Sequence, residues 1–290
     1  MRLTALEAHA VCAALVAADL VARAMRIQWI LRGLGHRTGF VEAFTLNAFG
    51  DGACAVTPMR AGGEPARLGG MLRAGVPAAA GVIAIGLEVL AAWPVTILAA
   101  GWMAWRHAPA WWAEAGPQLK AGLAGAWPWV TAVAAVSAVA WWVARRGGGG
   151  APKVRRPLRR ALVYLRRMPA WLPIATAPLS LVNLVARVAI LPVLALTLAD
   201  PPAMGPLWLG SFALLYAQLV LPTPSGAGAV ELGFLHGAAG QLGGAEASLL
   251  VAWRFYTSGV GILLGGWLAV RIYGAPALRR LAAVAGVRSP

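Results

Sequence analysis

Two short motifs each place a glutamate a few residues after a Thr-Pro pair, and these acids are the first candidates for chemistry. Residues 57–64 read TPMRAGGE and residues 223–231 read TPSGAGAVE. Each motif ends at its acid, Glu64 or Glu231, six or seven residues after the proline. A carboxylate there could accept hydrogen bonds from a cationic headgroup or bind a coupling proton. It could equally cap the amides of its own turn or pair with a nearby arginine.

Two arginines within apolar segments, Arg187 and Arg254, are candidates for binding an anion. A guanidinium fork fits the oxygens of a phosphate bidentately, so these side chains are suited to a lipid phosphate. The alternative is a structural ion pair with Glu88, Glu231 or Asp51. An ionisable group deep in a membrane costs at least about 2.5–3.5 kcal/mol, so each arginine needs a partner or a function.

The first motif carries two further cations, Arg60 and Arg67, which either attract headgroups or follow the preference for positive charge on the cytoplasmic side. Asn47 and Asp51 precede it and either contact substrate or satisfy irregular backbone. The small-residue turns permit close backbone approach, and their amides can hold a phosphate. The candidate substrate-binding residues are Arg60, Glu64, Arg67, Arg187, Glu231 and Arg254. The candidate structural or gating residues are Asn47, Asp51, Pro58, Gly62, Gly63, Glu88, Pro224, Gly226 and Gly228.

The sequence contains no motif of nucleotide-driven transport, hydrolysis or metal binding. It lacks GxxxxGK[ST], GxSxG and HExxH, and the four glycines at 147–150 are not followed by the ending of a P-loop. The two cysteines lie in apolar stretches and the four histidines are scattered, which indicates neither a disulfide framework nor a zinc site. We therefore expect no catalytic residues, no metal and no cofactor, in a protein that is not an enzyme.

The composition indicates an integral membrane protein. Of the 290 residues, 60% are apolar and 12% are charged, against about 25% charged in an ordinary soluble domain. The mean hydropathy is +0.70. Apolar runs of about 20 residues, enough to cross a bilayer, end in tryptophans typical of the membrane interface. The predicted fold class is all-α, a polytopic helical membrane protein.

The elements that must position the ionisable residues are apolar spans and two broken segments. The spans cover residues 8–31, 76–105, 123–143, 171–198 and 245–272. The broken segments are 40–58 and 207–239, and the first of them is expected to be interrupted at Asn47, Gly50, Asp51 and Gly52. Irregular backbone at membrane depth survives only where protein or water satisfies it. Both broken segments are therefore expected to line a cavity.

Other polar residues within the spans have structural explanations. Asp19 precedes Arg23 by one helical turn, which predicts an i,i+4 ion pair. Asn183 is expected to form a hydrogen bond with a neighbouring helix. These residues are not assigned to a binding site.

The distribution of charge predicts the orientation of the spans. Residues 145–167 hold nine cations and no acid, a pattern that marks a cytoplasmic linker. Nucleic-acid binding would need a polar domain, which the sequence lacks, so no nucleic-acid partner is expected. The C-terminus is then cytoplasmic and the N-terminus lies outside. Each broken segment must enter and leave from one face, 40–58 from the cytoplasm and 207–239 from outside.

The two motifs predict an internal repeat. The chain is expected to form a single transmembrane domain over residues 1–290, with halves at 1–119 and 120–290. On the predicted topology the matching motifs lie on opposite faces. Inverted repeats built on discontinuous helices place the substrate site between the halves of many transporters. We therefore expect two re-entrant segments related as an inverted repeat.

The motifs resemble the signatures of the lysylphosphatidylglycerol synthase transmembrane-region family. The run PMRAGGEPAR at 58–67 is similar to its first signature, and LPTPSGAGAVE, which ends at Glu231, is similar to its second. Arg254, followed by Phe-Tyr, resembles its Arg-containing final helix, and residues 24–35 resemble an early helix. The resemblance extends over most of the chain. It implies a stand-alone relative of the flippase portion of the multiple peptide resistance factor.

The resemblance implies a role in lipid transport. Because that flippase portion moves aminoacylated phosphatidylglycerol to the outer leaflet, we expect a phospholipid transporter in the bacterial cytoplasmic (inner) membrane. Relative to the family, the chain begins at what corresponds to the second span, so an N-terminal helix is expected to be absent. It carries no soluble aminoacyl-transferring domain, so lipid synthesis is not implied.

Two other functions stay open on the sequence. One is a membrane-embedded transferase acting on a lipid-linked substrate, which would need a catalytic acid or base and a site for a soluble donor. The other is a non-catalytic partner that docks a separate lipid synthase through the basic linker 145–167. These features make no prediction of the oligomeric state.

Overall fold

The computed structural model describes residues 2–109, 163, 169 and 171–274, with gaps at 220, 222, 238–241 and 243. Within these residues the elements are helices, and the described part contains no β-strand. The all-α fold class predicted from the sequence is confirmed. The predicted span 123–143 and, apart from one residue, the predicted linker 145–167 lie outside the described residues.

The helices fall into two stretches of the chain. Residues 2–109 form α1 (Ala5–Gly33), α2 (Phe40–Val56), α3 (Gly63–Arg73) and α4 (Ala78–His107). The later stretch forms α7 (Trp171–Val188), α8 (Ile190–Ala195), α9 (Met204–Ala217), α10 (Ala229–Gly237), α11 (Glu246–Arg254) and α12 (Val260–Ala269). A π-helical turn follows α11 at Phe255–Gly259 (η1), and another follows α12 at Val270–Gly274 (η2).

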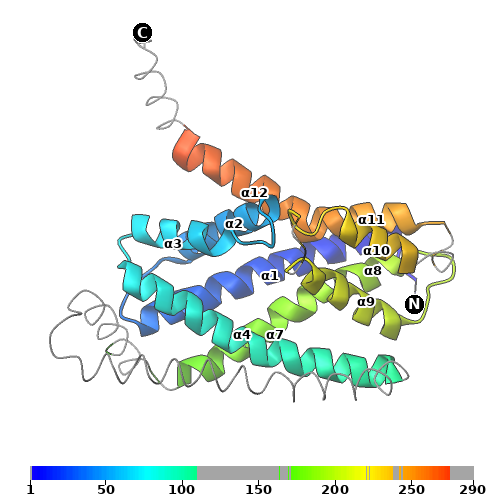
Figure 1. Ribbon diagram of the computed structural model, residues 1–290, viewed down its shortest axis with the longest axis horizontal. Coiled ribbons are helices and arrows are strands. Elements are labelled where there is room, and N and C mark those ends of the chain that lie inside the picture. The colour runs from blue at the N-terminus through cyan, green and yellow to red at the C-terminus, as the bar shows by residue number, and fades with distance from the viewer. Residues whose placement is uncertain are drawn as a thin grey trace, which may run out of the picture.

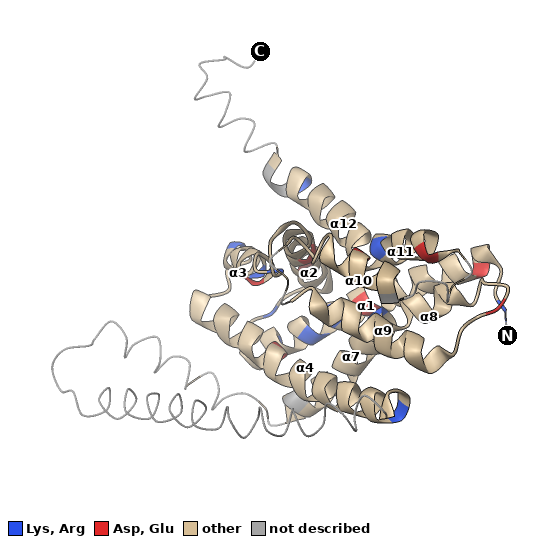
Figure 2. Cartoon of the chain, turned by 45° about the vertical axis from the view of Figure 1, so that its right-hand side comes forward, with Lys and Arg blue, Asp and Glu red and all other residues tan. Residues whose placement is uncertain are grey.

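Four helical segments in the described residues are long and apolar enough to cross a membrane. They are Ala5–Gly33, Ala78–His107, Ile174–Ala195 and Glu246–Ala269. Each coincides with a span predicted from the sequence, and the helices carry few Lys, Arg, Asp or Glu residues along their length (Figure 2). The expected membrane spans are therefore present wherever the structure describes them.

Local sequence explains where the first helices begin and end. α1 starts with a capping box, in which the Glu7 amide donates to the Thr4 hydroxyl at 3.3 Å and the Thr4 amide donates to the Glu7 carboxylate at 2.8 Å. α2 starts after Gly39, whose amide donates to the Glu42 carboxylate at 2.9 Å. Between the two helices Gly35 adopts a φ of +87°, which lets the chain turn away sharply from α1.

α1 runs through the middle of the molecule (Figure 1). It packs against α2, α4, α7 and α8. One apolar cluster joins Ile27 and Leu31 of α1 to Leu172 of α7. The other joins Cys12 of α1 to residues of the later stretch such as Trp253. α1 therefore contacts both stretches of the chain, and its polar side chains reach several helices.

α2 differs from the expectation drawn from the sequence. The polar and glycine residues at 47 and 50–52 do not interrupt it, because α2 is a single helix from Phe40 to Val56. A Cβ on Gly50 would lie 2.5 Å from Cγ of Arg67, so this glycine makes room for a side chain of α3. Packing against neighbours thus outweighs the low helix propensity of glycine. The break comes later, at residues 57–62, before α3 begins.

Glycines bring α2 and α12 into backbone contact. A Cβ on Gly265 would lie 2.6 Å from the carbonyl oxygen of Ala48 and 2.8 Å from Cα of Gly52. A Cβ on Gly261 would lie 3.2 Å from Cβ of Asp51. Small residues spaced four apart are typical of closely packed membrane helices. This contact fastens α2 to the last span.

The last span contains a π-helical turn that the sequence pattern does not predict. η1 interrupts the helical segment between α11 and α12, and its residues Thr257 and Ser258 are buried. Such single turns occur mostly inside longer helices and often mark functional positions. The π-helical turn η1 is therefore a candidate part of a functional site.

Candidate functional site

The two Thr-Pro turns touch each other. Pro58 and Pro224 form an isolated antiparallel bridge. Beside the bridge, the Ser225 hydroxyl donates to the carbonyl oxygen of Ala55 at 3.2 Å. From this contact the α2–α3 hairpin and the α9–α10 hairpin extend toward opposite ends of the molecule (Figure 1). The motifs singled out in the sequence therefore meet at one place.

Both turns hold non-glycine residues in the left-handed backbone region. Met59, Arg60 and Ser225 have φ values of 51°, 57° and 48°, and in the described residues they are the non-glycine positions with positive φ. Such conformations cost of order 1–3 kcal/mol each and persist where the surroundings impose them. Gly226 continues the second turn with a φ of +69°. Backbone strain in the described chain is thus concentrated where the hairpins meet.

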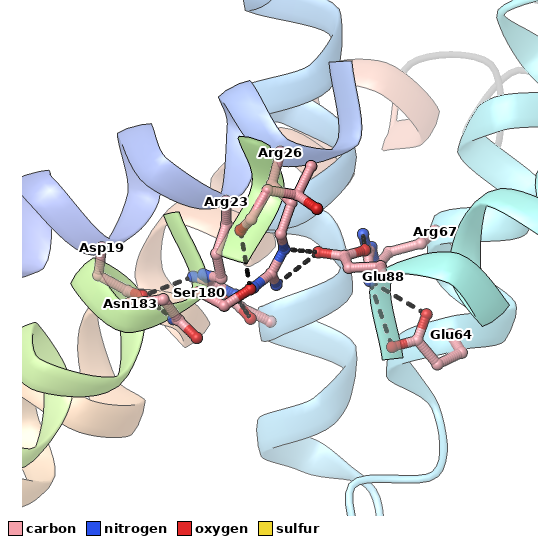
Figure 3. A network of polar contacts seen from close by, with 10 residues as sticks. Asp19, Arg23, Arg26, Glu64, Arg67, Glu88, Ser180 and Asn183 are labelled. Carbon is pink, nitrogen blue, oxygen red and sulfur yellow. Dashed lines mark hydrogen bonds and ion pairs between the residues drawn. The ribbon is translucent and has the colours of Figure 1, made fainter. Parts of the chain in front are cut away.

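A buried ionic network surrounds Glu88 of α4 (Figure 3). One carboxylate oxygen accepts from Nε and Nη2 of Arg26 at 2.9 and 2.6 Å, and the other accepts from Arg67 of α3. Arg67 also pairs with Glu64 at 3.1 Å, and Arg26 donates to the Ser180 hydroxyl of α7 at 3.0 Å. Buried charges need partners with good geometry. This network therefore joins α1, α3, α4 and α7.

A second network surrounds Arg23 of α1 (Figure 3). Arg23 pairs with Asp19 at 3.1 Å, as the i,i+4 spacing predicts, and its Nη1 donates to Asp51 of α2 at 2.6 Å. Asn183 of α7 donates to Asp19, so the expected hydrogen bond between helices is confirmed. The contacts of Asp19 and Asp51 thereby connect α1, α2 and α7.

The second hairpin has an ion pair of its own. Arg254 of α11 pairs with Glu231 of α10 at 2.6 Å and donates to the backbone carbonyl of Ser225 at 2.8 Å. Glu231 also accepts from the amide of Gly228 at 2.7 Å. The pair therefore holds the backbone of the second turn, which in turn contacts the first.

A cavity of about 30 Å³ lies beside the touching turns, bordered by α1, α2, α7 and the π-helical turn. This volume has room for about two water molecules. The charged residues of its lining are three arginines and two acids, Asp19, Arg23, Asp51, Arg60 and Arg187. The ionisable lining therefore carries one positive charge in excess.

Two of these arginines donate to neutral oxygens in the part of the chain that the structure describes. Within the described residues, no carboxylate forms an ion pair with Arg60 or Arg187. Arg60 donates to the side-chain oxygen of Gln218 at 3.1 Å, and Arg187 donates to the carbonyl oxygen of Thr257 at 3.2 Å. The hydroxyl of Ser258 is buried at the same cavity and has no hydrogen-bond partner in the described structure. The cavity thus offers donors suited to an anion.

The predicted site residues separate into groups. Arg60 and Arg67, which are neighbours in one motif, belong to different groups, because Arg67 turns toward Glu88 and Arg60 toward the cavity. The groups are Glu64 with Arg67 and Glu88, Glu231 with Arg254, and Asp51 with Arg60 and Arg187. Asn47 is buried, and its side-chain nitrogen has no hydrogen-bond partner in the described part.

Sequence reasoning missed Arg26 and Gln218. A signal existed for Arg26, because a cation inside an apolar span requires a counter-charge. For Gln218 no signal existed, since a single amide near a Pro-Gly segment has many explanations. Among the described residues, no group of three or more His, Cys, Asp or Glu side chains could hold a metal ion.

Apolar helices of spanning length, tied together by buried ion pairs, define a multi-pass helical membrane protein. Residues 2–265 match the model of the family described as the lysylphosphatidylglycerol synthase TM region. The chain belongs to this family, which confirms the resemblance noted in its motifs. No curated protein and no solved structure gives a significant match.

Proposed function

We propose that the chain is a lipid transporter that moves a phospholipid between the leaflets of a membrane. The observation that carries this proposal is the contact between the two turns at Pro58 and Pro224, beside a charged cavity in a predominantly apolar helical protein. A polar path at this place would let a headgroup cross while the acyl chains stay in the bilayer. Membership of the family supports a lipid-related role.

The arrangement of the hairpins supports an inverted repeat of two re-entrant segments. Equivalent prolines of the two motifs face each other antiparallel, as positions related by a local two-fold axis would. The hairpins open toward opposite ends of the molecule (Figure 1). In transporters built this way, one half moves against the other around a site between them. We infer that the turns separate during transport.

The networks divide the predicted site into two roles. Arg60 and Arg187 contact the headgroup phosphate, because among the described residues neither forms an ion pair and both donate to neutral oxygens. Glu231 with Arg254, and Arg67 with Glu64, hold the turns and gate the path. In this proposal the chain is not an enzyme. It lies in the bacterial inner membrane with a cytoplasmic C-terminus, and its partner is a phospholipid.

Leaflet movement in proteoliposomes tests this proposal. The full chain is reconstituted with a lipid whose headgroup carries a label accessible to a membrane-impermeant quencher. We expect the wild type to expose inner-leaflet label with time, and Glu231→Gln and Arg254→Ala to slow this movement at least about tenfold, since each leaves a charge in the path unpaired. The matched control is Arg37→Gln, which removes an exposed cation that belongs neither to the turns nor to the cavity lining.

The outcomes separate the function from the assigned roles. Movement by the wild type and the control, lost in both variants, would support a transporter gated at the second turn. Movement that survives both changes would contradict the roles given to Glu231 and Arg254. Liposomes in which no lipid moves faster than in protein-free controls would contradict transport itself.

A further inference from the structure

We propose that the cavity beside the turns selects a lipid whose headgroup is a singly charged phosphodiester without a cationic group. This inference deepens the lipid transport proposed above and rests on it. It follows from how the ionisable side chains of the cavity are already used within the protein.

The two acids of the cavity are fully engaged by the protein. Asp51 accepts from Arg23 at 2.6 Å, and Asp19 pairs with the same arginine at 3.1 Å while accepting from Asn183. Their side chains are only 16% and 8% exposed. A lysyl or ethanolamine headgroup would find a carboxylate only by displacing Arg23. That displacement would leave a buried guanidinium without a counter-charge, which is strongly unfavourable.

Two of the three arginines of the cavity, Arg60 and Arg187, donate to neutral oxygens, and within the described residues neither forms an ion pair. Arg60 donates to the amide oxygen of Gln218, and Arg187 donates to a backbone carbonyl. Both can exchange these partners for phosphate oxygens, which form stronger, charge-assisted bonds. Ser258 adds a buried hydroxyl whose hydrogen-bonding capacity is unused in the described structure. The excess of one positive charge is balanced by one phosphodiester, whereas a phosphomonoester or pyrophosphate would bring in additional negative charge.

The position of Arg60 explains how a headgroup would enter. Arg60 belongs to the first turn, and its partner Gln218 belongs to the second hairpin. Separation of the turns would widen the cavity beyond its present 30 Å³ and at the same time release the guanidinium for phosphate. The remaining lining includes apolar side chains such as Val16, Leu20 and Ile190. These favour a phosphate attached to a lipid over a free phosphate ion.

Competition for binding in detergent solution tests the selection. The full chain is mixed with short-chain phosphatidylglycerol, phosphatidylethanolamine, lysyl-phosphatidylglycerol or inorganic phosphate, and bound lipid is counted by native mass spectrometry. We expect phosphatidylglycerol to bind at least about tenfold more tightly than the two amine-bearing lipids, because their ammonium groups would face uncompensated cations. Inorganic phosphate is expected not to displace it.

Three variants examine the mechanism of selection. Arg60→Gln and Arg187→Gln remove one cation each and should abolish the preference for phosphatidylglycerol. Gln218→Glu keeps both arginines and supplies Arg60 with an acid, so it should abolish the preference while keeping the contact between the hairpins. Arg37→Gln should retain the preference, since Arg37 is exposed and outside the cavity lining.

The outcomes distinguish this inference from the transport proposal. Equal binding of the cationic lipid, or a preference that all three variants retain, would overturn the selection even if lipid movement in liposomes is intact. Displacement by inorganic phosphate at equal concentration would assign the cavity to a soluble anion and overturn it as well. A preference lost in the variants, in a protein that moves no lipid, would support the selection and contradict only transport.

Discussion

Glu88 of α4 and Arg254 of α11 hold equivalent positions with opposite charges. Each lies thirty residues after the proline of the preceding Thr-Pro turn. Each forms an ion pair with the hairpin that contains this turn, Glu88 with Arg67 and Arg254 with Glu231. The two parts of the chain therefore fasten a hairpin to the following long helix in the same way, with acid and base exchanged.

The two pairs differ in how deeply they are buried, and this difference has consequences for stability. Glu88 is 5% exposed and neutralises two arginines, whereas Glu231 is 30% exposed and neutralises one. Removing the partner of a buried charge is more costly than removing that of a half-exposed one.

Glu88→Gln is expected to destabilise the fold by about 3–5 kcal/mol, because it removes the carboxylate that pairs with buried Arg26 and leaves Arg67 with only the half-exposed Glu64. Thermal unfolding in detergent, followed by tryptophan fluorescence, measures the change. The matched control is Glu64→Gln, since Glu64 pairs with Arg67 but is 50% exposed. Its cost should stay below about 1 kcal/mol. Equal losses for the two variants would contradict the central place given to Glu88.

Gly265→Ala should lower the stability of the fold, whereas Gly266→Ala should raise it. A Cβ on Gly265 meets the backbone of α2 at 2.6–2.8 Å, whereas a Cβ on Gly266 meets nothing within 4 Å. Overpacking typically costs about 1–3 kcal/mol, while alanine in an open helical position gains up to about 1 kcal/mol over glycine. Unfolding temperatures of the two variants, compared with the wild type, test the contact between α2 and α12. A Gly265→Ala protein as stable as the wild type would contradict it.

A disulfide between the turns is expected to stop lipid movement reversibly. The paired positions of an antiparallel bridge have Cα atoms about 4.5–5.5 Å apart, within the range of disulfides. Pro58→Cys with Pro224→Cys, in a chain whose Cys12 and Cys54 are replaced by alanine, should transport when reduced and stall when oxidised. Each single cysteine variant serves as the control. Unchanged movement after complete oxidation would mean that the turns need not separate.

Arg254→Lys should lower the free energy of unfolding by less than Arg254→Gln does. Lysine retains a positive charge for Glu231 but lacks the planar fork that also reaches the carbonyl of Ser225. Glutamine leaves Glu231 without its cation, and we expect a loss of about 1.5–3 kcal/mol. Comparing unfolding temperatures of the two variants gives the order. The reverse order would show that the hydrogen bond to the turn matters more than the ion pair.

Much of the helical framework could be predicted from the sequence because its causes are local. Apolar runs long enough to cross a bilayer define the spans, and the i,i+4 spacing of Asp19 and Arg23 defines their ion pair. The partners of Arg26 could not be predicted in this way, because Glu88 and Ser180 lie 62 and 154 residues further along the chain. No periodicity within a single helix contains that information.

Three residues of the cavity lining, Asp51, Arg60 and Arg187, were candidates from the sequence, whereas Ser258 and the partner Gln218 were not. The likeness of the two motifs indicated Pro58 and Pro224, yet only the fold brings them into contact. The glycines of α2 were interpreted as breaks, although Gly50 and Gly52 are places where Arg67 and α12 approach closely. In sequence, a glycine that ends a helix looks the same as a glycine that leaves space for a neighbouring side chain or helix. Only the tertiary packing distinguishes the two.

The central position of α1 has a consequence for how the protein is made. Arg26 leaves the ribosome 62 residues before Glu88, which at about 5–20 residues per second amounts to roughly 3–12 seconds. During this interval the nascent helix carries a cation whose carboxylate has not yet left the ribosome. We therefore expect α1 to reach its final packing only after α4 has been made. The order of synthesis thus places the pairing of these distant segments after the first helix has formed.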